Sequence, residues 1–562
     1  MVMMTGARAC IETLIKEGVE VIFGIPGGAT LPFYDALLGT KLKHVLVRHE
    51  QCAAHMADGY ARASGRPGVC TATSGPGATN LVTGIANAYM DSSPIVAITG
   101  QVGRPFIGRD AFQEADIIGI TASITKHNFQ PSSAKELPSV IRAALRIATE
   151  RRPGPVVVDL PKDVQVAEVD IDLSSDSEPP SPSRVVTPSP IQLKKAIQLL
   201  KGAEKPVILA GGGVRISNAT EELQTFSERF GIPVATTLMG KGCIPENHPN
   251  AVGMIGMHGR LAANMLINES DVILAVGCRF SDRSTGSMQE FAKNSSIIHI
   301  DIDASEIGKN IDVEVPIVGD AKTTLSAILK ELGDEPHRRS STWFEHMQKL
   351  KKELDMEASQ NEAGPWLKPP QIFKRLRKLL PLDTIVTTDV GQHQMWAALH
   401  FEAYSPRSFI SSGGLGTMGF GFPAALGAKV ARPDKPVVNF AGDGSFLMVE
   451  QELACSIKER IPVVVIIFNN GVLGMPAQWQ RLFYGKRYSG IDLSGTPDFV
   501  KLAEAYGAVG KRVQSYDELE VAVKDGLRSD VTTVIDVPIS PEEDVFPMVA
   551  PGKGLKDIMI SD

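Results

Sequence analysis

The sequence predicts an α/β protein built from three doubly wound parallel-sheet domains, and two observations carry this prediction. First, 562 residues exceed what one hydrophobic core usually serves. Second, short β-branched runs alternate with helical patterns along the chain, which is typical of parallel strands covered by helices. The strands expected from these runs are residues 19–23, 44–47, 68–72, 95–99, 207–210, 272–276, 297–302, 385–388, 437–441 and 463–468.

Two stretches of unusual composition divide the chain. Residues 174–190 are rich in Ser and Pro and lack periodicity, which indicates an extended linker. Residues 336–369 are strongly charged, and their pattern predicts a solvated helix flanked by linker. The domains are therefore expected at residues 1–173, 191–335 and 370–562.

Composition and charge exclude several classes of protein. With 43% hydrophobic residues, a net charge of -7 and no dense block of Lys and Arg, the chain is neither disordered nor a typical nucleic-acid binder. No apolar run approaches the roughly 18 residues that a membrane span needs. The six cysteines lack disulfide or zinc spacing, so we expect reduced core thiols. No targeting segment precedes the first helical pattern near Thr5, and we expect a cytoplasmic protein that binds small molecules.

The most informative segment begins at Gly442-Asp443-Gly444 and ends at Asn470. Asp443 and Asn470 each follow an expected strand, and a helix with apolar residues at spacings of three and four lies between them. A right-handed β-α-β unit brings both loops to one edge of the sheet. A carboxylate and an amide oxygen there suit Mg²⁺, which normally completes its coordination with phosphate and water. The alternative is a pair of unrelated tight turns.

This segment resembles the signature of the thiamin diphosphate enzymes, GDG followed by a double Asn. The resemblance implies that Asp443, Asn470 and the carbonyl of Val472 hold Mg²⁺ on the cofactor diphosphate, next to Gly442 and Gly444. It further implies that Glu50, in RHEQ, donates a proton to the cofactor's aminopyrimidine and that Met418, in GTMG, wedges the cofactor into a bent form. Taken alone, Glu50 could simply be a favourable charge in the first turn of a helix. In this superfamily the site lies between two subunits, so a homodimer or homotetramer is expected.

From GIPGGATLPFYDAL to VFPMVAPGKGLKDIM, essentially the whole chain resembles the catalytic subunits of acetolactate synthase. The resemblance implies a loop near the thiazolium and a set of residues that handle the keto acids. Of these, Arg283 would orient the acceptor carboxylate and Trp479 would contact its alkyl group. The full set is Gly28, Phe112, Gln113, Lys162, Arg283, Met475 and Trp479, with Gly28, Gln113 and Lys162 expected to act in catalysis.

The resemblance also implies FAD in the central domain. The residues expected to hold it are Gly211, Gly212, Gly213, Met257, His258, Asp301 and Asp320. Two residues depart from the family pattern: Ser281 stands where Asp is common, and Pro476 stands where a β-branched residue is usual.

The implied reaction decarboxylates pyruvate and adds the hydroxyethyl carbanion to a second 2-keto acid, pyruvate or 2-ketobutyrate, in branched-chain amino-acid biosynthesis. FAD would be structural, and a regulatory small subunit is allowed. Two alternatives stay open: a pyruvate oxidase or another thiamin diphosphate-dependent decarboxylase, and a non-catalytic nucleotide-binding protein on the same scaffold. The pairing of Arg283 with Trp479 argues against the first, and the intact Glu50, Asp443 and Asn470 argue against the second.

Overall fold

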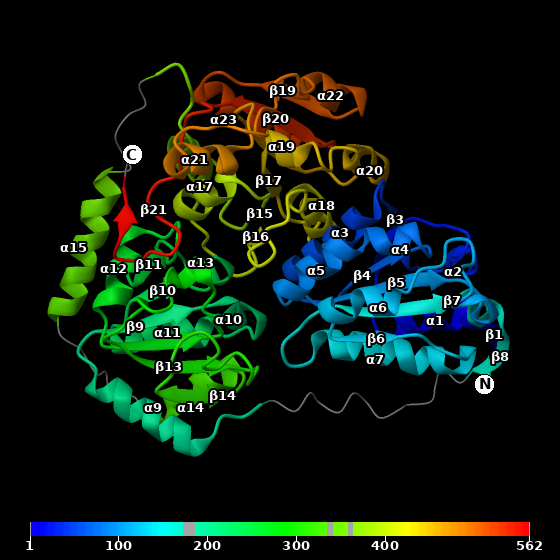
Figure 1. The fold of residues 1–562 in the computed structure, drawn as a ribbon, viewed down its shortest axis with the longest axis horizontal. Coiled ribbons are helices and arrows are strands. Elements are labelled where there is room, and N and C mark those ends of the chain that lie inside the picture. The colour runs from blue at the N-terminus through cyan, green and yellow to red at the C-terminus, as the bar shows by residue number, and fades with distance from the viewer. Residues whose placement is uncertain (1, 172–185, 334–340, 358–363, 561–562) are drawn as a thin grey trace.

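The computed structural model describes residues 2–171, 186–333, 341–357 and 364–560, and it contains three six-stranded parallel sheets with helices packed on them (Figure 1). The α/β class and the three sheets are confirmed. The limits of the domains stay predictions, and residues 174–185 of the first expected linker lie outside the described residues.

The N-terminal domain, blue to cyan in Figure 1, carries the first sheet. Its strands are β2 (Val21–Gly24), β3 (Lys43–Leu46), β4 (Gly68–Ala72), β5 (Ile95–Gln101), β6 (His127–Phe129) and β7 (Val156–Pro161), with β1 (Val2–Thr5) paired antiparallel to β8 (Glu168–Ile171). Its helices are α1 (Gly6–Lys16), α2 (Leu31–Leu37), α3 (Glu50–Ser64), α4 (Pro76–Asn80), α5 (Val82–Met90), α6 (Ile117–Thr121), α7 (Leu137–Thr149) and α8 (Lys162–Val166).

The central domain, green in Figure 1, carries the second sheet. Its strands are β9 (Pro206–Ala210), β10 (Val234–Thr236), β11 (Ala251–Met254), β12 (Val272–Val276), β13 (Ser296–Asp301) and β14 (Val315–Val318). Its helices are α9 (Pro190–Gly202), α10 (Gly212–Ile216), α11 (Thr220–Phe230), α12 (Leu261–Glu269), α13 (Asp282–Thr285), α14 (Ala321–Leu332) and α15 (Ser341–Glu357).

The C-terminal domain, yellow to orange, carries the third sheet, and the end of the chain returns to the central domain through the small pair β21 (Met548–Val549) and β22 (Ile558–Met559). The strands of the sheet are β15 (Ile385–Thr388), β16 (Phe409–Ser411), β17 (Val437–Gly442), β18 (Val464–Asn469), β19 (Val509–Arg512) and β20 (Thr533–Pro538). The helices are α16 (Pro369–Leu379), α17 (Gln392–His400), α18 (Gly421–Ala431), α19 (Asp443–Phe446), α20 (Glu452–Glu459), α21 (Gly474–Phe483), α22 (Phe499–Ala505) and α23 (Tyr516–Arg528).

Strand order fixes where each sheet can bind a ligand. The outer sheets share one order, β3-β2-β4-β5-β7-β6 and β16-β15-β17-β18-β20-β19, whereas the central order is β11-β10-β9-β12-β13-β14. Each order reverses beside the first strand of its sheet, and open α/β sheets bind ligands outside the carboxyl ends of the strands at that reversal. The candidate positions are therefore the loops after β2 and β4, after β9 and β12, and after β15 and β17.

Two local expectations need correction. The continuous helix expected after Gly444 is two helices, α19 and α20, because turns between them carry both Phe446 and Leu453 into a core shared by the N-terminal and C-terminal domains. The charged helix expected to be solvated is α15, whose Trp343 and Met347 are buried in the central core. The prediction was wrong because the many charged residues of this helix made its narrow apolar face, about one residue per turn, hard to recognise.

The cysteines match expectation, since all six are free and buried. Among the described residues, no helix is long and apolar enough to cross a membrane.

Helices α3 and α18 join the N-terminal domain to the C-terminal domain. Gly59 of α3 lies against the backbone of Ala424, and Gly427 of α18 lies against the backbone of Met56. A Cβ atom at Gly59 would lie 2.2 Å from the carbonyl oxygen of Ala424, so only glycine permits this approach. Apolar side chains from both domains surround the contact in one core.

Replacing Gly59 with Ala should therefore lower the free energy of unfolding by about 1–3 kcal/mol, because the methyl group forces the two helices apart. Gly202→Ala is the matched control: Gly202 is also helical, but a Cβ there meets nothing within 4 Å. Denaturant unfolding of both variants measures the difference. Equal stability of the two variants would contradict the described packing.

Candidate functional site

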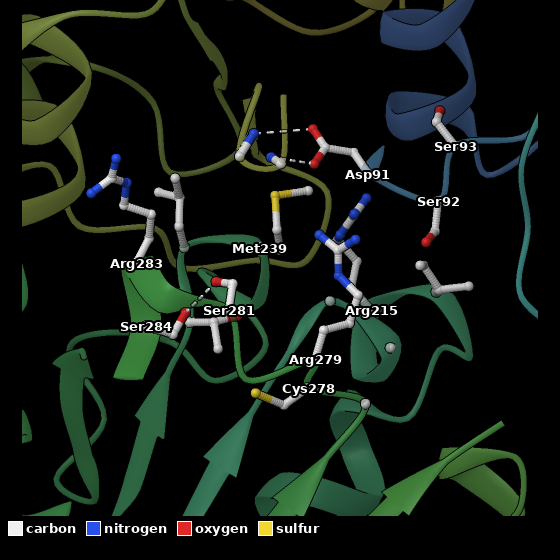
Figure 2. Close-up of a pocket in the computed structure, with 18 of the residues that line it drawn as sticks. Asp91, Ser92, Ser93, Arg215, Met239, Cys278, Arg279, Ser281, Arg283 and Ser284 are labelled. Atoms are coloured by element: carbon white, nitrogen blue, oxygen red, sulfur yellow. Dashed lines mark hydrogen bonds between the residues drawn. The ribbon is translucent and has the colours of Figure 1, made fainter. Parts of the chain in front are cut away.

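A cavity of about 1690 Å³ lies where the three domains meet (Figure 2). Its walls include the loops after β9 and β12 in the central domain, as the strand order requires, and the start of α21 in the C-terminal domain. Of the residues expected to hold FAD or the acceptor acid, those that line it are Gly212, Gly213, Met257, His258, Asp301, Asp320, Arg283, Met475 and Trp479.

The acceptor-site residues come together from two domains. The Arg283 guanidinium carbon lies 5.9 Å from the centre of the Trp479 ring, and its Nη1 lies 3.4 Å from the sulfur of Met257. Met475 lies one turn before Trp479 on α21. The nearest carboxylate oxygen to Arg283 is 4.0 Å away, on Asp282, and the Arg283 side chain is 58% exposed. This guanidinium is therefore available to a ligand carboxylate.

In another part of the cavity two acids lie at the carboxyl ends of β13 and β14, the second and third strands beyond the reversal. Asp301 ends β13 and accepts a hydrogen bond from the backbone of Asp303, and burial raises the pKa of Asp301 to about 6. Asp320 caps α14 and accepts hydrogen bonds from the backbone and hydroxyl of Thr323. Among the described residues, the second carboxylate oxygen of each acid accepts no hydrogen bond. Arg152 of the N-terminal domain borders this part of the cavity and forms ion pairs with Asp303 and Glu306.

The glycines after β9 have two different surroundings. Gly212 and Gly213 line the cavity, whereas Gly211 packs against Gly277, whose carbonyl oxygen would lie 2.1 Å from a Cβ. Gly211 therefore allows the loops after β9 and β12 to pack closely against each other, and it does not line the cavity.

Two arginines that the sequence reasoning did not single out project into the cavity from this region, Arg215 of α10 and Arg279 after β12 (Figure 2). Arg215 is 5% exposed, and burial together with the like charges of Arg62 and Arg407 lowers its pKa to about 10. Within the described part of the chain, neither guanidinium makes a hydrogen bond or an ion pair. A buried, unpaired guanidinium is costly, so the surroundings of Arg215 suit an anionic ligand.

The metal-loop residues converge as predicted. The Asp443 carboxylate accepts a hydrogen bond of 2.8 Å from the backbone of Gly471, beside Asn470, whose side-chain oxygen accepts one from the backbone of Val472. Asp443 is 2% exposed and has no cationic partner among the described residues, and burial raises its pKa to about 6. A buried carboxylate with only backbone donors, next to an amide oxygen, fits a bound Mg²⁺. Met418 reaches the same loop, since its methyl group would lie 4.0 Å from a Cβ at Gly444.

Two polar residues at this edge were missed by the sequence reasoning. Gln392 and His393 open α17 just after β15; the Gln392 side-chain oxygen accepts a hydrogen bond from Asn470, and the His393 ring lies against Gly442. His393 is buried, its Nε2 has no partner among the described residues, and burial lowers its pKa to about 3. The sequence did carry a signal for these two residues, because they are polar and closely follow a strand of buried residues.

The expected residues of the N-terminal domain form a separate group at the carboxyl edge of the first sheet. Thr73 lies against Gly27, the neighbour of Gly28, and also against Gly77, which lies close to the Glu50 carboxylate. Gln113 lies against Gly75. The Glu50 carboxylate accepts a hydrogen bond of 2.9 Å from Asn80. Lys162 begins α8 at the end of β7, where it is exposed, and Phe112 is 89% exposed. None of these residues lines the cavity described above.

The two departures from the family pattern both line the cavity. Ser281 precedes α13, and its hydroxyl pairs with that of Ser284 at 3.3 Å. Pro476 lies in the first turn of α21. Backbone N–H groups in a first turn have no acceptor within the helix, so proline costs no hydrogen bond there.

Comparison with known proteins defines the class. The thiamine pyrophosphate enzyme family matches three segments: its N-terminal TPP binding domain matches residues 4–120, its central domain 193–328, and its C-terminal TPP binding domain 389–537. The sheets and the site described above are thus those of a thiamin diphosphate-dependent enzyme.

Relatives with assigned names narrow this class. The "Probable acetolactate synthase large subunit" of Methanocaldococcus jannaschii is 53% identical over 570 residues, covering 99% of this chain and 95% of that protein. The "Acetolactate synthase large subunit" of Corynebacterium glutamicum is 47% identical over 99% of this chain and 90% of its own. The "Acetolactate synthase isozyme 2 large subunit" of Escherichia coli is 44% identical over 99% of both chains. The chain belongs to the acetolactate synthase large-subunit family.

The raised pKa of Asp443 predicts that any metal binding at this carboxylate depends on pH. Only the deprotonated carboxylate binds a cation, so Mg²⁺-dependent affinity for thiamin diphosphate should be full above the pKa of about 6 and fall by about tenfold per pH unit below it. Calorimetric titrations from pH 5 to 8 measure this dependence. Asp443→Asn, which cannot titrate, gives the pH dependence that comes from the ligand itself. An identical pH dependence in the two proteins would remove Asp443 from the metal site.

Proposed function

We propose that this protein decarboxylates pyruvate and adds the two-carbon unit to a second 2-keto acid, pyruvate or 2-ketobutyrate, as an acetolactate synthase of branched-chain amino-acid biosynthesis. The observation that carries the proposal is the meeting of Arg283, Trp479 and Met257 in the cavity next to the helix that carries Met475. A decarboxylase that releases its product as aldehyde needs no second carboxylate-binding group.

Asp443, Asn470 and the carbonyl of Val472 would hold Mg²⁺ on the cofactor diphosphate, and the unpartnered His393 Nε2 offers a further polar contact. Thiamin diphosphate supplies the nucleophilic carbon and the electron sink of this chemistry when bound. Glu50 would exchange a proton between its carboxyl group and the pyrimidine nitrogen, and Met418 would set the bend of the cofactor. Arg283 would orient the acceptor carboxylate, while Trp479 contacts its alkyl group.

We infer that the complete site needs a second copy of this chain. Gly28, Phe112 and Lys162 are exposed, and none of them lines the cavity of their own chain. Exposed apolar residues accompany them at the same edge, including Leu31 and Phe106, and others flank the metal side, including Leu415 and Met448. Two such surfaces suit a symmetric dimer in which Gly28, Gln113 and Lys162 of one copy face the metal loop of the other.

The same cavity would hold FAD. Asp301 and Asp320, which line it, would face the ribose hydroxyls, and Arg215 and Arg279, which form no ion pair among the described residues, would meet the diphosphate near Gly212 and Gly213. Guanidinium groups bind diphosphates well because their donors match two phosphate oxygens. The net reaction transfers no electrons, so FAD would be a structural ligand, whereas a pyruvate oxidase would use it as an acceptor.

Two further features complete the proposal. The relatives named above are large subunits, which suggests a small regulatory partner for this chain as well. Six buried cysteines without a disulfide suit a reducing compartment such as the cytoplasm.

The acceptor site can be tested by product ratio. Incubation with pyruvate, 2-ketobutyrate, thiamin diphosphate, Mg²⁺ and FAD should give 2-acetolactate and 2-aceto-2-hydroxybutyrate, with little acetaldehyde or peroxide. Trp479→Leu should lower the preference for 2-ketobutyrate by about 5- to 150-fold, because one methylene contact is worth about 1–3 kcal/mol. Arg283→Lys keeps the charge but loses the planar fork, so acetaldehyde should rise. Unchanged product ratios in folded, cofactor-loaded variants would favour the oxidase or decarboxylase alternatives.

The FAD site can be tested without turnover. Arg215→Met should weaken FAD binding by about 10- to 100-fold, since a buried charged hydrogen bond is worth about 1.5–3 kcal/mol, while riboflavin, which has no diphosphate, should bind nearly as before. Titration followed by flavin fluorescence measures the affinity of the protein for each of the two ligands. Arg432→Met, which removes a surface arginine paired with Asp434, is the control. Equal loss for FAD and riboflavin would mean that Arg215 does not recognise the diphosphate.

A further inference from the structure

Glu452, the first residue of α20, is a fully buried carboxyl group that no role above uses. Its Oε1 accepts hydrogen bonds from the backbone N–H groups of Arg48, at 2.8 Å, and His49, at 3.0 Å. These two residues directly precede Glu50. Glu452 follows Asp443 in the chain across α19 and a short turn, so one carboxyl group links the metal side of the C-terminal domain to the backbone in front of Glu50.

The link continues from His49 to the Glu50 carboxylate. His49 caps α3, since its Nδ1 accepts a hydrogen bond of 3.2 Å from the backbone of Gln51. Glu50 is the first residue of the helix, and Asn80 donates to its Oε2 at 2.9 Å. Gly77 leaves room beside the other oxygen, since a Cβ there would lie only 3.3 Å from Oε1. The backbone in front of Glu50 is held through Glu452, and the Glu50 side chain is held by Asn80.

The surroundings of Glu452 indicate that it acts as a hydrogen-bond acceptor. The Arg48 guanidinium does not pair with it but donates to the carbonyl oxygens of Leu46 and Val47. The thiols of Cys52 and Cys455 lie beside the carboxyl group and can donate weak hydrogen bonds to it. Among the described residues no cationic side chain forms an ion pair with Glu452, and a buried acid without a cationic partner is costly to the fold, so its presence calls for an explanation.

We propose that Glu452 is a positioning residue for Glu50: by accepting the backbone N–H groups of Arg48 and His49, it fixes the start of α3 and so the direction of the Glu50 carboxylate. This inference rests on the proposed role of Glu50 in proton transfer. The contact joins two domains within one chain. In the proposed dimer it therefore couples the metal loop of one site to the proton-transfer group of the other.

The test uses the full-length protein loaded with thiamin diphosphate, Mg²⁺ and FAD. Glu452→Met removes both acceptors with little change in volume, whereas Glu452→Gln keeps a carbonyl oxygen at the same place. Ser456→Ala is the matched control, because Ser456 is buried on the same helix and its hydroxyl donates to the carbonyl of Ile461, away from α3. Two quantities are measured: exchange of the thiazolium proton of bound cofactor in D₂O, and backbone amide exchange over residues 47–52.

In Glu452→Met we expect thiazolium exchange to slow by about 10- to 100-fold, because a displacement of about 1 Å is enough for such a loss, with cofactor affinity within about threefold of wild type. Amide exchange over residues 47–52 should rise. Glu452→Gln should keep both quantities within about threefold of wild type, since its oxygen still accepts. Ser456→Ala should change neither.

Wild-type thiazolium exchange in Glu452→Met would overturn the proposal, as would equal slowing in the Met and Gln variants or in Ser456→Ala. Failure of the proposed function looks different. In that case wild-type protein that binds thiamin diphosphate does not accelerate thiazolium exchange over the free cofactor, and the positioning role is overturned along with it.

Discussion

Helices α3 and α18 meet backbone to backbone, and the arrangement of the domains, the cavity between them and the start of α3 depend on this contact. Glycines at positions 59 and 427 allow it, because any side chain there would collide with the main chain of the other helix. The contact merges the cores of the N-terminal and C-terminal domains and fixes the angle between their sheets. With that angle set, the central domain closes a cavity against both neighbours, and α3 is held where it begins, at Glu50.

Charges without partners mark the places where ligands complete the protein. Asp443 is a buried acid held only by backbone donors, and Arg215 is a buried base whose guanidinium forms no ion pair among the described residues. Each charge is unfavourable alone and would be stabilised by a ligand of opposite charge, which in the proposed function is a metal ion for Asp443 and a diphosphate for Arg215. Ion pairs such as Arg62 with Asp58 and Asp91 serve the fold, because their charges are satisfied within the chain.

Local sequence pattern was enough to predict the fold class and the convergence of Asp443 with Asn470, because a β-α-β unit fixes both loops by handedness alone. Strand β4 at Gly68–Ala72 and strand β12 at Val272–Val276 were predicted with their observed bounds. Short strands such as β10 were not predicted, since three residues carry no readable periodicity. Arg215, Gln392 and Glu452 were also missed. Their significance comes from contacts or missing contacts with residues distant in sequence, and no local spacing encodes those.

The central claim is that one catalytic site takes Glu50 from one copy of the chain and Asp443 from another. Glu50→Gln and Asp443→Ala, each inactive alone, test it when the two variants are mixed and reassembled with saturating cofactors. A shared site leaves one intact site in every mixed dimer, so the account predicts about a quarter of wild-type acetolactate formation from an equal mixture. If both residues acted within one chain, every site in the mixture would carry a defect. A mixture as inactive as its two components, with mixed dimers shown to form, would contradict the account.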